Sequence, residues 1–296
     1  MIRSCLEFTA DVDYKKLKNF LYKNDISVRL LNGIKRLDMV LVNSVPAYTI
    51  ASINKGDKVT VLLPYEDTIS CEPEDIPVNI IYEDLDILVV SKPHGMVTHP
   101  ASGSYFHTLG NAVTNYYINS GYKIPFRPVS RLDKETSGLI VIAKNKYSHL
   151  VLSREMAEGS YEKVYLARVT GNVEGDGEIT EPIGRECEGT VRRACRLDGK
   201  YAHTIYKVLE KGDNSTLLEV EIKTGRTHQI RVHMEHIGHP IIGDPIYGIT
   251  PYERMLLHAS YVSFNHPVTK ERISFKSPIQ LSNILGDGGS MILHKI

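Results

Sequence analysis

One short segment, residues 131–138, combines residue types that can hold a reactive carboxylate. Its sequence is Arg-Leu-Asp-Lys-Glu-Thr-Ser-Gly, and it leads directly into the apolar stretch Leu139–Ala143. Asp133 follows a cation and precedes a turn with two hydroxyl residues, so its carboxylate can accept hydrogen bonds that stabilise the ionised form and fix its direction. A carboxylate held in this way can act as a nucleophile. The same eight residues would also suit a turn that only caps a strand.

A second segment, residues 224–234, has the sequence Thr-Gly-Arg-Thr-His-Gln-Ile-Arg-Val-His-Met and follows an apolar strand at 217–222. Apolar residues at helical spacing predict a helix over residues 227–237, so the order is strand, glycine turn and amphipathic helix. We expect Arg226 in the first helical turn and Arg231 one turn later. Such a helix start attracts an anion, either a substrate phosphate or a carboxylate of the protein. A solvated helix face with two arginines is the alternative.

A third segment, residues 162–167, is predicted to be a strand. Lys163 and Tyr165 then point to the same face of a sheet. If that face lines the site, a phenol stands beside Asp133, where it can stack on a base or move a proton. A tyrosine half buried on a sheet is the plainer interpretation. The turn Lys92–Gly95 also ends an apolar strand, where loops carry function, but alone it is unspecific.

Four histidines, with Asp244 nearby, invite a metal interpretation. They lie between residues 228 and 239, and His233 and His236 could share one helix face. The sequence lacks the His-Glu-x-x-His arrangement and a second well-spaced ligand set. We therefore expect no metal and interpret these histidines as hydrogen-bonding or packing residues.

The composition is that of a soluble globular protein with room for two domains. No apolar run approaches the roughly 18 residues of a membrane span, and the acidic residues soon after the start do not suit a signal peptide. We expect a cytoplasmic protein with no membrane contact. The four cysteines form no Cys-x-x-Cys pair, so we interpret them as reduced structural thiols; they are Cys5, Cys71, Cys187 and Cys195.

The charges balance overall but are segregated along the chain. Lys plus Arg equal Asp plus Glu at 35 each, yet residues 65–91 hold eight acids and no Lys or Arg. Residues 121–170 hold nine Lys or Arg against five acids, and residues 185–211 repeat this bias. A protein without net charge can thus carry a basic face for a polyanion. Ordinary solvated surfaces would give the same counts.

The pattern of apolar residues predicts an α+β protein of two domains. Helices over 14–21 and 28–37, followed by strands over 39–43 and 57–63, form a small αα-ββ module. Later segments are mostly strands with three helices, over 107–119, 146–156 and 227–237, which indicates a mixed, mainly antiparallel sheet. We expect four parts: a module at 1–64, an acidic linker at 65–77, a catalytic domain at 78–281 and a tail at 282–296.

Taken in order, the segments of the second domain resemble the RluA family of RNA pseudouridine synthases, and Arg131–Gly138 and Thr224–Arg231 are the most specific matches. The N-terminal module resembles a divergent S4 RNA-binding domain, through Val42–Ser44 and Gly56–Val59. Its basic helix is thin, with only Arg29, Lys35 and Arg36. The stretches that carry the family resemblance are Ile87–Pro100, Arg131–Lys144, Lys163–Gly171, Ala202–Leu209, Leu217–Gly248 and Leu257–Pro267.

The resemblance implies an enzyme that isomerises uridines in structured RNA to pseudouridine without a cofactor. Asp133 would be the catalytic aspartate, Arg231 its ion-pair partner and Tyr165 the active-site tyrosine. Ribosomal RNA is the favoured substrate, with transfer RNA as the alternative, and we expect a monomer. The target uridine would be flipped from its stack to reach the site. The residues expected to contact RNA are Arg131, Lys163, Arg226, His228, Arg127, Arg192 and Arg193.

Ser130 departs from the family pattern, which usually has histidine before Arg-Leu-Asp. Because Asp133 and its turn are intact, we expect altered packing or flipping contacts and not a loss of activity. Two other functions are compatible with parts of the sequence. An RNA-binding or ribosome-assembly factor would keep the fold without the reaction, and the intact set of Asp133, Tyr165 and Arg231 argues against it. A metal-dependent hydrolase would have to use the histidine cluster.

Overall fold

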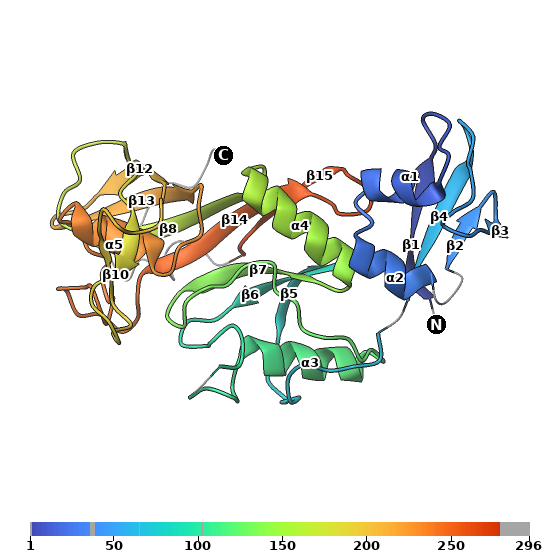
Figure 1. Ribbon diagram of the computed structural model, residues 1–296. Coiled ribbons are helices and arrows are strands. Elements are labelled where there is room, and N and C mark those ends of the chain that lie inside the picture. Colours follow the sequence, from blue (N-terminus) through green and yellow to red (C-terminus); the bar gives the residue numbers. More distant parts are fainter. Residues whose placement is uncertain (1, 36–38, 65, 102, 279–296) are drawn as a thin grey trace.

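The computed structural model describes residues 2–35, 39–64, 66–101 and 103–278, and it shows a small N-terminal module at one end of a larger mixed domain (Figure 1). The end of the helix predicted over 28–37, residues 279–281 and the predicted tail at 282–296 lie outside the described residues. None of the described helices is long and apolar enough to cross a membrane.

A nine-stranded sheet organises the larger domain, as far as the structure describes it. The strand order is β5-β6-β7-β14-β8-β13-β12-β9, with β15 paired to β14. Every pairing is antiparallel except that of β7 with β14, which confirms the expected α+β class with a mainly antiparallel sheet. The strands are β5 (Asn79–Glu83), β6 (Ile87–Lys92), β7 (Ser137–Ala143), β8 (Glu162–Thr170), β9 (Gly177–Ile179), β12 (Thr204–Lys211), β13 (Ser215–Ile222), β14 (Leu257–Asn265) and β15 (Arg272–Lys276).

The parallel pairing of β7 with β14 joins the two halves of this sheet. It consists of two residue pairs, Ser137 with His258 and Gly138 with Ala259. Gly138 has a φ of +114°, and a Cβ there would lie 2.3 Å from the carbonyl oxygen of Ala259. Only glycine fits this approach. Gly138 therefore allows β7 and β14 to pair where the two halves of the sheet meet, a few residues after Asp133.

Three helices cover the sheet, and their starts have clear local causes. The helix α3 (Leu109–Asn119) begins with a capping box between Thr108 and Asn111. The helix α4 (Lys146–Glu158) begins at Asn145, whose side chain accepts the Ser148 N–H, and ends at Gly159 in the left-handed conformation. Side chains of α3 and α5 (Gln229–His236) share one core with the sheet, whereas Leu152 of α4 packs in another.

The start of α5 corrects one expectation. The helix was predicted to begin at residue 227, with Arg226 in its first turn. His228 instead has a left-handed φ of 60°, and the helix begins at Gln229. Arg226 therefore lies in the turn before the helix, where its backbone N–H donates to the Gln229 side chain. Arg231 lies within the first turn.

The N-terminal module has the predicted order of two helices and two strands, with additional strands. The helix α2 (Val28–Lys35) and the strands β2 (Val40–Val42) and β4 (Lys58–Pro64) lie where they were predicted. The helix α1 (Leu17–Lys23) begins three residues later than the predicted 14–21, because Tyr14 pairs with Ile53 in a β-bridge. The first strand, β1 (Ile2–Thr9), was not predicted, and neither was the short β3 (Val45–Pro46). The sheet order is β1-β4-β2-β3, so β1 pairs with β4 along almost its whole length.

The module packs against α4 of the larger domain. Tyr147 and Val151 of α4 belong to the hydrophobic core of the module. Arg154, one turn further along, forms an ion pair with Asp25. Glu66, directly after β4, pairs with Arg127 at 2.6 Å. The module is thus fixed to a helix that also contributes to the pocket described below.

Candidate active site

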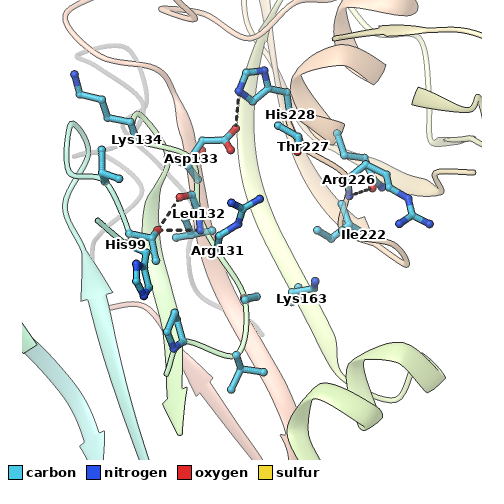
Figure 2. A pocket seen from close by; sticks show the side chains of 18 of the residues that line it. His99, Arg131, Leu132, Asp133, Lys134, Lys163, Ile222, Arg226, Thr227 and His228 are labelled. Atoms are coloured by element: carbon cyan, nitrogen blue, oxygen red, sulfur yellow. Dashed lines mark hydrogen bonds and ion pairs between the residues drawn. The ribbon is translucent and has the colours of Figure 1, made fainter. Parts of the chain in front are cut away.

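A cavity of about 860 Å³ lies where the loop before β7, the strand β8 and the turn before α5 meet (Figure 2). Among the residues that the structure describes, Asp133 is the only acidic one that lines it. Six Lys or Arg line the same cavity, so the pocket of this protein without net charge is strongly positive. A concave, cationic pocket with a single carboxylate suits an anionic ligand. The six are Arg127, Arg131, Lys134, Lys163, Arg226 and Arg231.

The backbone on both sides of Asp133 is fixed by side chains of the preceding loop. Thr98 donates from its hydroxyl to the Leu132 carbonyl at 2.8 Å and accepts the Leu132 N–H at 3.2 Å. Lys92, at the end of β6, donates to the Lys134 carbonyl at 3.2 Å. The residues before and after Asp133 are therefore held in place, which limits the movement of the carboxylate between them.

Lys92 is an unusual anchor, because it is fully buried and uses only carbonyl acceptors. Its ammonium also donates to the carbonyls of Pro93 at 2.8 Å and Met96 at 2.7 Å. Three acceptors match the three hydrogens of an ammonium group. Burial nevertheless lowers the pKa of Lys92 to about 7. The Lys-Pro-x-Gly turn, unspecific in sequence, is thus tied to the loop that carries Asp133.

Arg231 connects Asp133 to a second, buried carboxylate. Its Nη1 lies 3.2 Å from Asp133 Oδ2, while its Nε and Nη2 each lie 2.7 Å from an oxygen of Asp244. The side chain of Arg231 is 3% exposed and that of Asp244 is 0% exposed, whereas Asp133 is 30% exposed to the cavity. Burial acts to raise the pKa of Asp244, but the Arg231 guanidinium and two backbone N–H groups lower it overall. The bidentate pair orients the arginine.

The hydroxyl residues that follow Asp133 do not hold its carboxylate, contrary to expectation. Ser137 bonds His258 at 2.8 Å and accepts from Arg254 at 2.7 Å. Thr136 is buried, and its backbone N–H donates to the Asp133 carbonyl, not to the carboxylate. These two residues stabilise the turn and the pairing of β7 with β14, whereas Arg231 orients the Asp133 carboxylate.

Tyr165 and His228 complete the surroundings of Asp133. Tyr165 lies on β8, paired with Ala259 of β14, and burial together with the charge of Asp133 raises its pKa. His228 Nε2 lies 3.9 Å from Asp133 Oδ2, and its other ring nitrogen bonds the Tyr247 hydroxyl at 2.9 Å. Burial lowers the pKa of His228. Both rings are therefore neutral at pH 7 and can donate hydrogen bonds or stack.

The residues expected to contact RNA differ in how much of their hydrogen-bonding capacity the protein uses. Arg131 is exposed at the pocket, and Arg226 donates from Nε to the Tyr201 carbonyl. Arg127 is paired with Glu66, and Arg193, which does not line the cavity, donates its backbone N–H to the Tyr247 hydroxyl. Arg192 is occupied by Glu186, Glu235 and the Ile246 carbonyl, so little of it remains for RNA. Lys163 lines the cavity.

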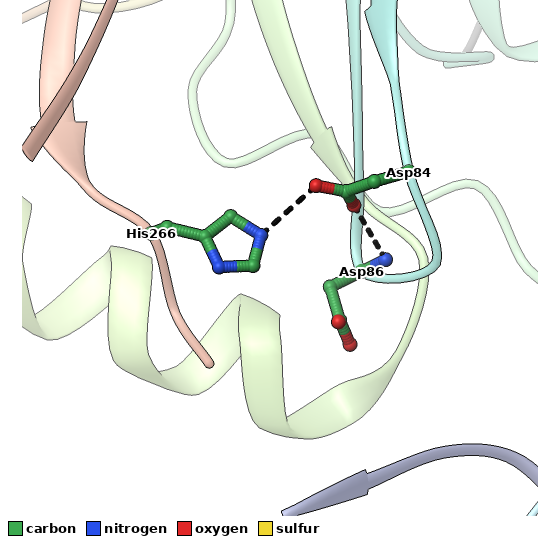
Figure 3. Close-up of side chains that lie close together, drawn as sticks. All are labelled: Asp84, Asp86 and His266. Atoms are coloured by element: carbon green, nitrogen blue, oxygen red, sulfur yellow. Dashed lines mark hydrogen bonds and ion pairs between the residues drawn. The ribbon is translucent and has the colours of Figure 1, made fainter. Parts of the chain in front are cut away.

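The histidine cluster does not come together as a metal site. His233 bonds Thr204 and the Glu181 carbonyl, while His239 bonds the Thr170 carbonyl. Each imidazole thus serves a separate protein partner. The group with metal-compatible spacing that the described residues do form is elsewhere, and it consists of Asp84, Asp86 and His266 (Figure 3).

In that group His266 donates to Asp84 from Nε2 at 3.0 Å and accepts backbone N–H groups at Nδ1. Asp86 accepts from Asn145 at 2.7 Å. Both ring nitrogens and the buried carboxylate are therefore engaged in holding the turn between β5 and β6, next to the N-terminal module.

Sequence reasoning missed Asp244 as the partner of Arg231, and it missed Lys92 and Thr98 as anchors. Asp244 stood out only as a neighbour of the histidines. The signal was its position inside the Leu217–Gly248 stretch, in a Gly-Asp pair before Tyr247. No local pattern indicates that its carboxylate turns back to a helix thirteen residues earlier.

The comparisons with known proteins identify the class of this protein as an RNA-modifying isomerase of the pseudouridine synthase type. The family model for RNA pseudouridylate synthase matches residues 86–236. An uncharacterised RNA pseudouridine synthase of Bacillus subtilis, YlyB, is 38% identical over 93% of this chain and 94% of its own length. The chain belongs to the RNA pseudouridylate synthase family, in its RluA branch, and is an RNA pseudouridine synthase.

Two further matches extend this finding. Ribosomal large subunit pseudouridine synthase D of Zymomonas mobilis is 38% identical over 78% of this chain and 77% of its own length. Among solved structures, human RNA pseudouridylate synthase domain containing 1 has a TM-score of 0.60 and 28% identity, and it covers 73% of this chain and 89% of its own. The family resemblance of the sequence is thereby confirmed.

Proposed function

We propose that this enzyme converts a uridine in structured ribosomal RNA to pseudouridine, with Asp133 as the catalytic aspartate and without a cofactor. Transfer RNA is the alternative substrate. Several relatives are named for the large ribosomal subunit, which favours ribosomal RNA. The observation that carries the assignment of Asp133 is that, among the described residues, it is the one carboxylate lining a cationic pocket, and it is bonded to a buried arginine.

The reaction itself needs no co-reactant. The N1–C1′ bond of the nucleoside breaks, the base turns, a C5–C1′ bond forms, and the proton lost from C5 is balanced by one gained at N1. Asp133 acts as the nucleophile toward the base or the sugar of the uridine, and the bond that it forms breaks again when the C5–C1′ bond is made, which regenerates the carboxylate. The alternative is that Asp133 assists the removal of a ribose proton by Tyr165. The raised pKa of Tyr165 keeps its phenol protonated, so this ring serves as a stacking surface and hydrogen-bond donor. Arg231 maintains the carboxylate in its ionised, oriented form.

The N-terminal module is proposed to be an S4-like RNA-binding unit. Its helix pair and strands follow the expected order, and Lys15, Lys16 and Arg29 are exposed on it. Because the module packs on α4, these cations keep a fixed position relative to the pocket. The cytoplasmic location remains a prediction of the sequence.

The test is to map pseudouridines in cellular RNA with and without the gene, and then with variants of the gene. Asp133→Asn keeps the size of the side chain and removes its charge, and it should restore none of the missing sites. Glu135→Gln changes a carboxylate two residues away in the same loop and should restore them all. Restoration by Asp133→Asn would contradict the proposed role, and no change on gene loss would contradict the function.

A further inference from the structure

The cavity continues along β8 beyond Asp133 and Tyr165 toward α4. His149 and Met156 of α4 line this extension together with Lys163 and Gly225. Figure 2 shows Lys163 on its strand, between Arg131 and Ile222 and away from Asp133. The proposed function assigns no role to this part of the pocket.

Lys163 is a buried cation without a charged partner among the described residues. The residue is 7% exposed, and its ammonium bonds only the Met156 sulfur, at 3.5 Å. Burial lowers its pKa to about 8. A buried ammonium is costly unless something compensates its charge. The other buried lysine of this region, Lys92, has its ammonium compensated by three carbonyl acceptors. Lys163 has no such acceptors among the described residues.

The space next to this ammonium is kept open by a glycine. A Cβ at Gly225, in the turn before α5, would lie 3.8 Å from Lys163 Nζ. The backbone of Gly225 has no positive φ, so its glycine is not needed for conformation. A side chain there would instead cover the ammonium. The two residues thus form an open, positively charged recess in the wall of the pocket.

We propose that Lys163 binds the RNA phosphodiester group directly adjacent to the target uridine. The inference rests on the proposed function, since the anion belongs to the RNA substrate. Lysine is a common phosphate ligand and acts as a point charge. Arg131 and Arg226 lie on either side and extend the cationic wall toward solvent, where the strand would leave the pocket.

A phosphate fits this recess better than the uracil ring does. The base must reach Asp133, and Figure 2 shows Lys163 at a distance from that carboxylate. Lys163 precedes Tyr165 by two residues, or roughly 7 Å along the strand. A group that far from the reacting base is the neighbouring backbone of the same RNA strand. If Lys163 instead contacted the base, its replacement would lower the rate of the chemical step.

The decisive variant is Lys163→Met, which removes the charge and keeps a flexible chain beside Met156. RNA binding is measured with Asp133→Asn protein, so that no turnover occurs, on a short RNA that carries the mapped uridine. We expect affinity to fall by tenfold or more and the log–log salt slope to become shallower by about 0.7, the value of one phosphate contact on a single strand. We also expect Lys163→Met to melt at a temperature equal to or above that of the parent protein.

A neutral methylphosphonate placed at each linkage in turn identifies the phosphate. One linkage beside the uridine should lower the affinity of the parent protein about as much as Lys163→Met does, and should have no additional effect on the variant. If the methylphosphonate at every linkage lowered the affinity of Lys163→Met as much as that of the parent protein, the proposal would be overturned. So would a loss of turnover through kcat with KM unchanged, which would place Lys163 at the base. A lower melting temperature with intact affinity would show a structural role.

Two further variants make the test independent of a single substitution. Gly225→Val keeps the charge and fills the recess, and it should weaken RNA binding by a similar factor. Lys207→Met removes an exposed charge on β12, outside the pocket, and should change the affinity little. If Lys207→Met matched Lys163→Met, the effect would be one of general charge and the proposal would fail.

Failure of the proposed function is separable from failure of this inference. Absence of pseudouridine changes on gene loss contradicts the function alone. The recess can then be tested by binding of a single-stranded RNA, with the same variants and the same linkage scan. Intact isomerisation with RNA affinity that does not depend on Lys163 contradicts the inference alone.

Discussion

Two buried cations line the same pocket, and the protein treats them in opposite ways. Arg231 is surrounded by two carboxylates, with Asp244 on its Nε and Nη2 and Asp133 on its Nη1. Lys163, two residues before Tyr165 on β8, has a thioether sulfur as its hydrogen-bond partner. The residues are 3% and 7% exposed, so burial does not distinguish them.

The difference indicates which charge serves the protein and which serves the ligand. A buried ion pair with all its hydrogen bonds made fixes the positions of its members, and here the carboxylate of Asp133 is the member that faces the cavity. A buried charge without a partner lowers the stability of the free protein and gains its partner only when an anion arrives. Mutations at the two cations should therefore have opposite effects on stability.

The strongest test of the comparison is Arg231→Met. It leaves the fully buried Asp244 and the partly buried Asp133 without a cation, at a cost of about 3–5 kcal/mol in the free energy of unfolding. Isomerisation should be lost as well. Denaturant titration of the purified variant measures the first effect.

Lys163→Met is the matched control, because it also replaces a buried cation by methionine on the same pocket wall. It should leave the unfolding free energy unchanged or increase it. Equal destabilisation by both variants would remove the distinction between a paired and an unpaired cation.

A smaller effect is expected for Asp244→Asn, which keeps the volume and removes one charge of the pair. The amide keeps one acceptor oxygen and replaces the other by an NH₂ donor, so the bidentate pair is lost and Arg231 loses its fixed orientation. A misplacement of about 1 Å in a catalytic group can cost about a hundredfold in rate, and we expect kcat to fall by about ten- to a hundredfold. Because Asp244 does not line the cavity, KM for RNA should change little.

Steady-state kinetics on the mapped RNA separate these two quantities. Asp198→Asn provides the control, since that carboxylate pairs with Arg196 on an exposed surface and should be neutral. A rise in KM with kcat unchanged would mean that Asp244 supports RNA binding and not the orientation of Asp133.

The same contrast explains how far the sequence could predict the site. Asp133, Tyr165 and Arg231 were singled out because each lies in a local pattern, a turn, a strand or a helix, that fixes its surroundings. The catalytic sheet was predicted for a similar reason, since the runs of β-branched residues in β6 and β7 are long and apolar. Local patterns thus indicated which residues matter.

The partners of these residues could not be predicted, because they depend on contacts distant in sequence. Asp133 was expected to be held by its own turn, yet it is held by Arg231, 98 positions later. Lys92 reaches Lys134 across 42 positions. The strand β1 was not predicted, and its pairing partner β4 begins far along the chain, at Lys58. The sheet topology brings together residues that are so far apart in the sequence.

The smallest effect concerns pH and follows from the unpaired state of Lys163. Burial lowers its pKa in the free protein to about 8, whereas an unfolded lysine titrates near 10.4. The desolvation penalty on stability is therefore fully present below pH 8 and is lost as the pH rises toward 10.4. An RNA phosphate binds the ammonium form, so RNA affinity should fall above pH 8, by at most about tenfold per pH unit.

Both consequences can be measured as the difference between the parent protein and Lys163→Met. Below pH 8 the variant should be the more stable and the weaker binder, and both differences should shrink together as the pH rises from 8 to 10. The neighbouring His149 does not mimic this change, because burial lowers its pKa and the ring is neutral throughout this range. Differences that stayed constant with pH would show that Lys163 has a compensating partner in the free protein, and the contrast with Arg231 would no longer hold.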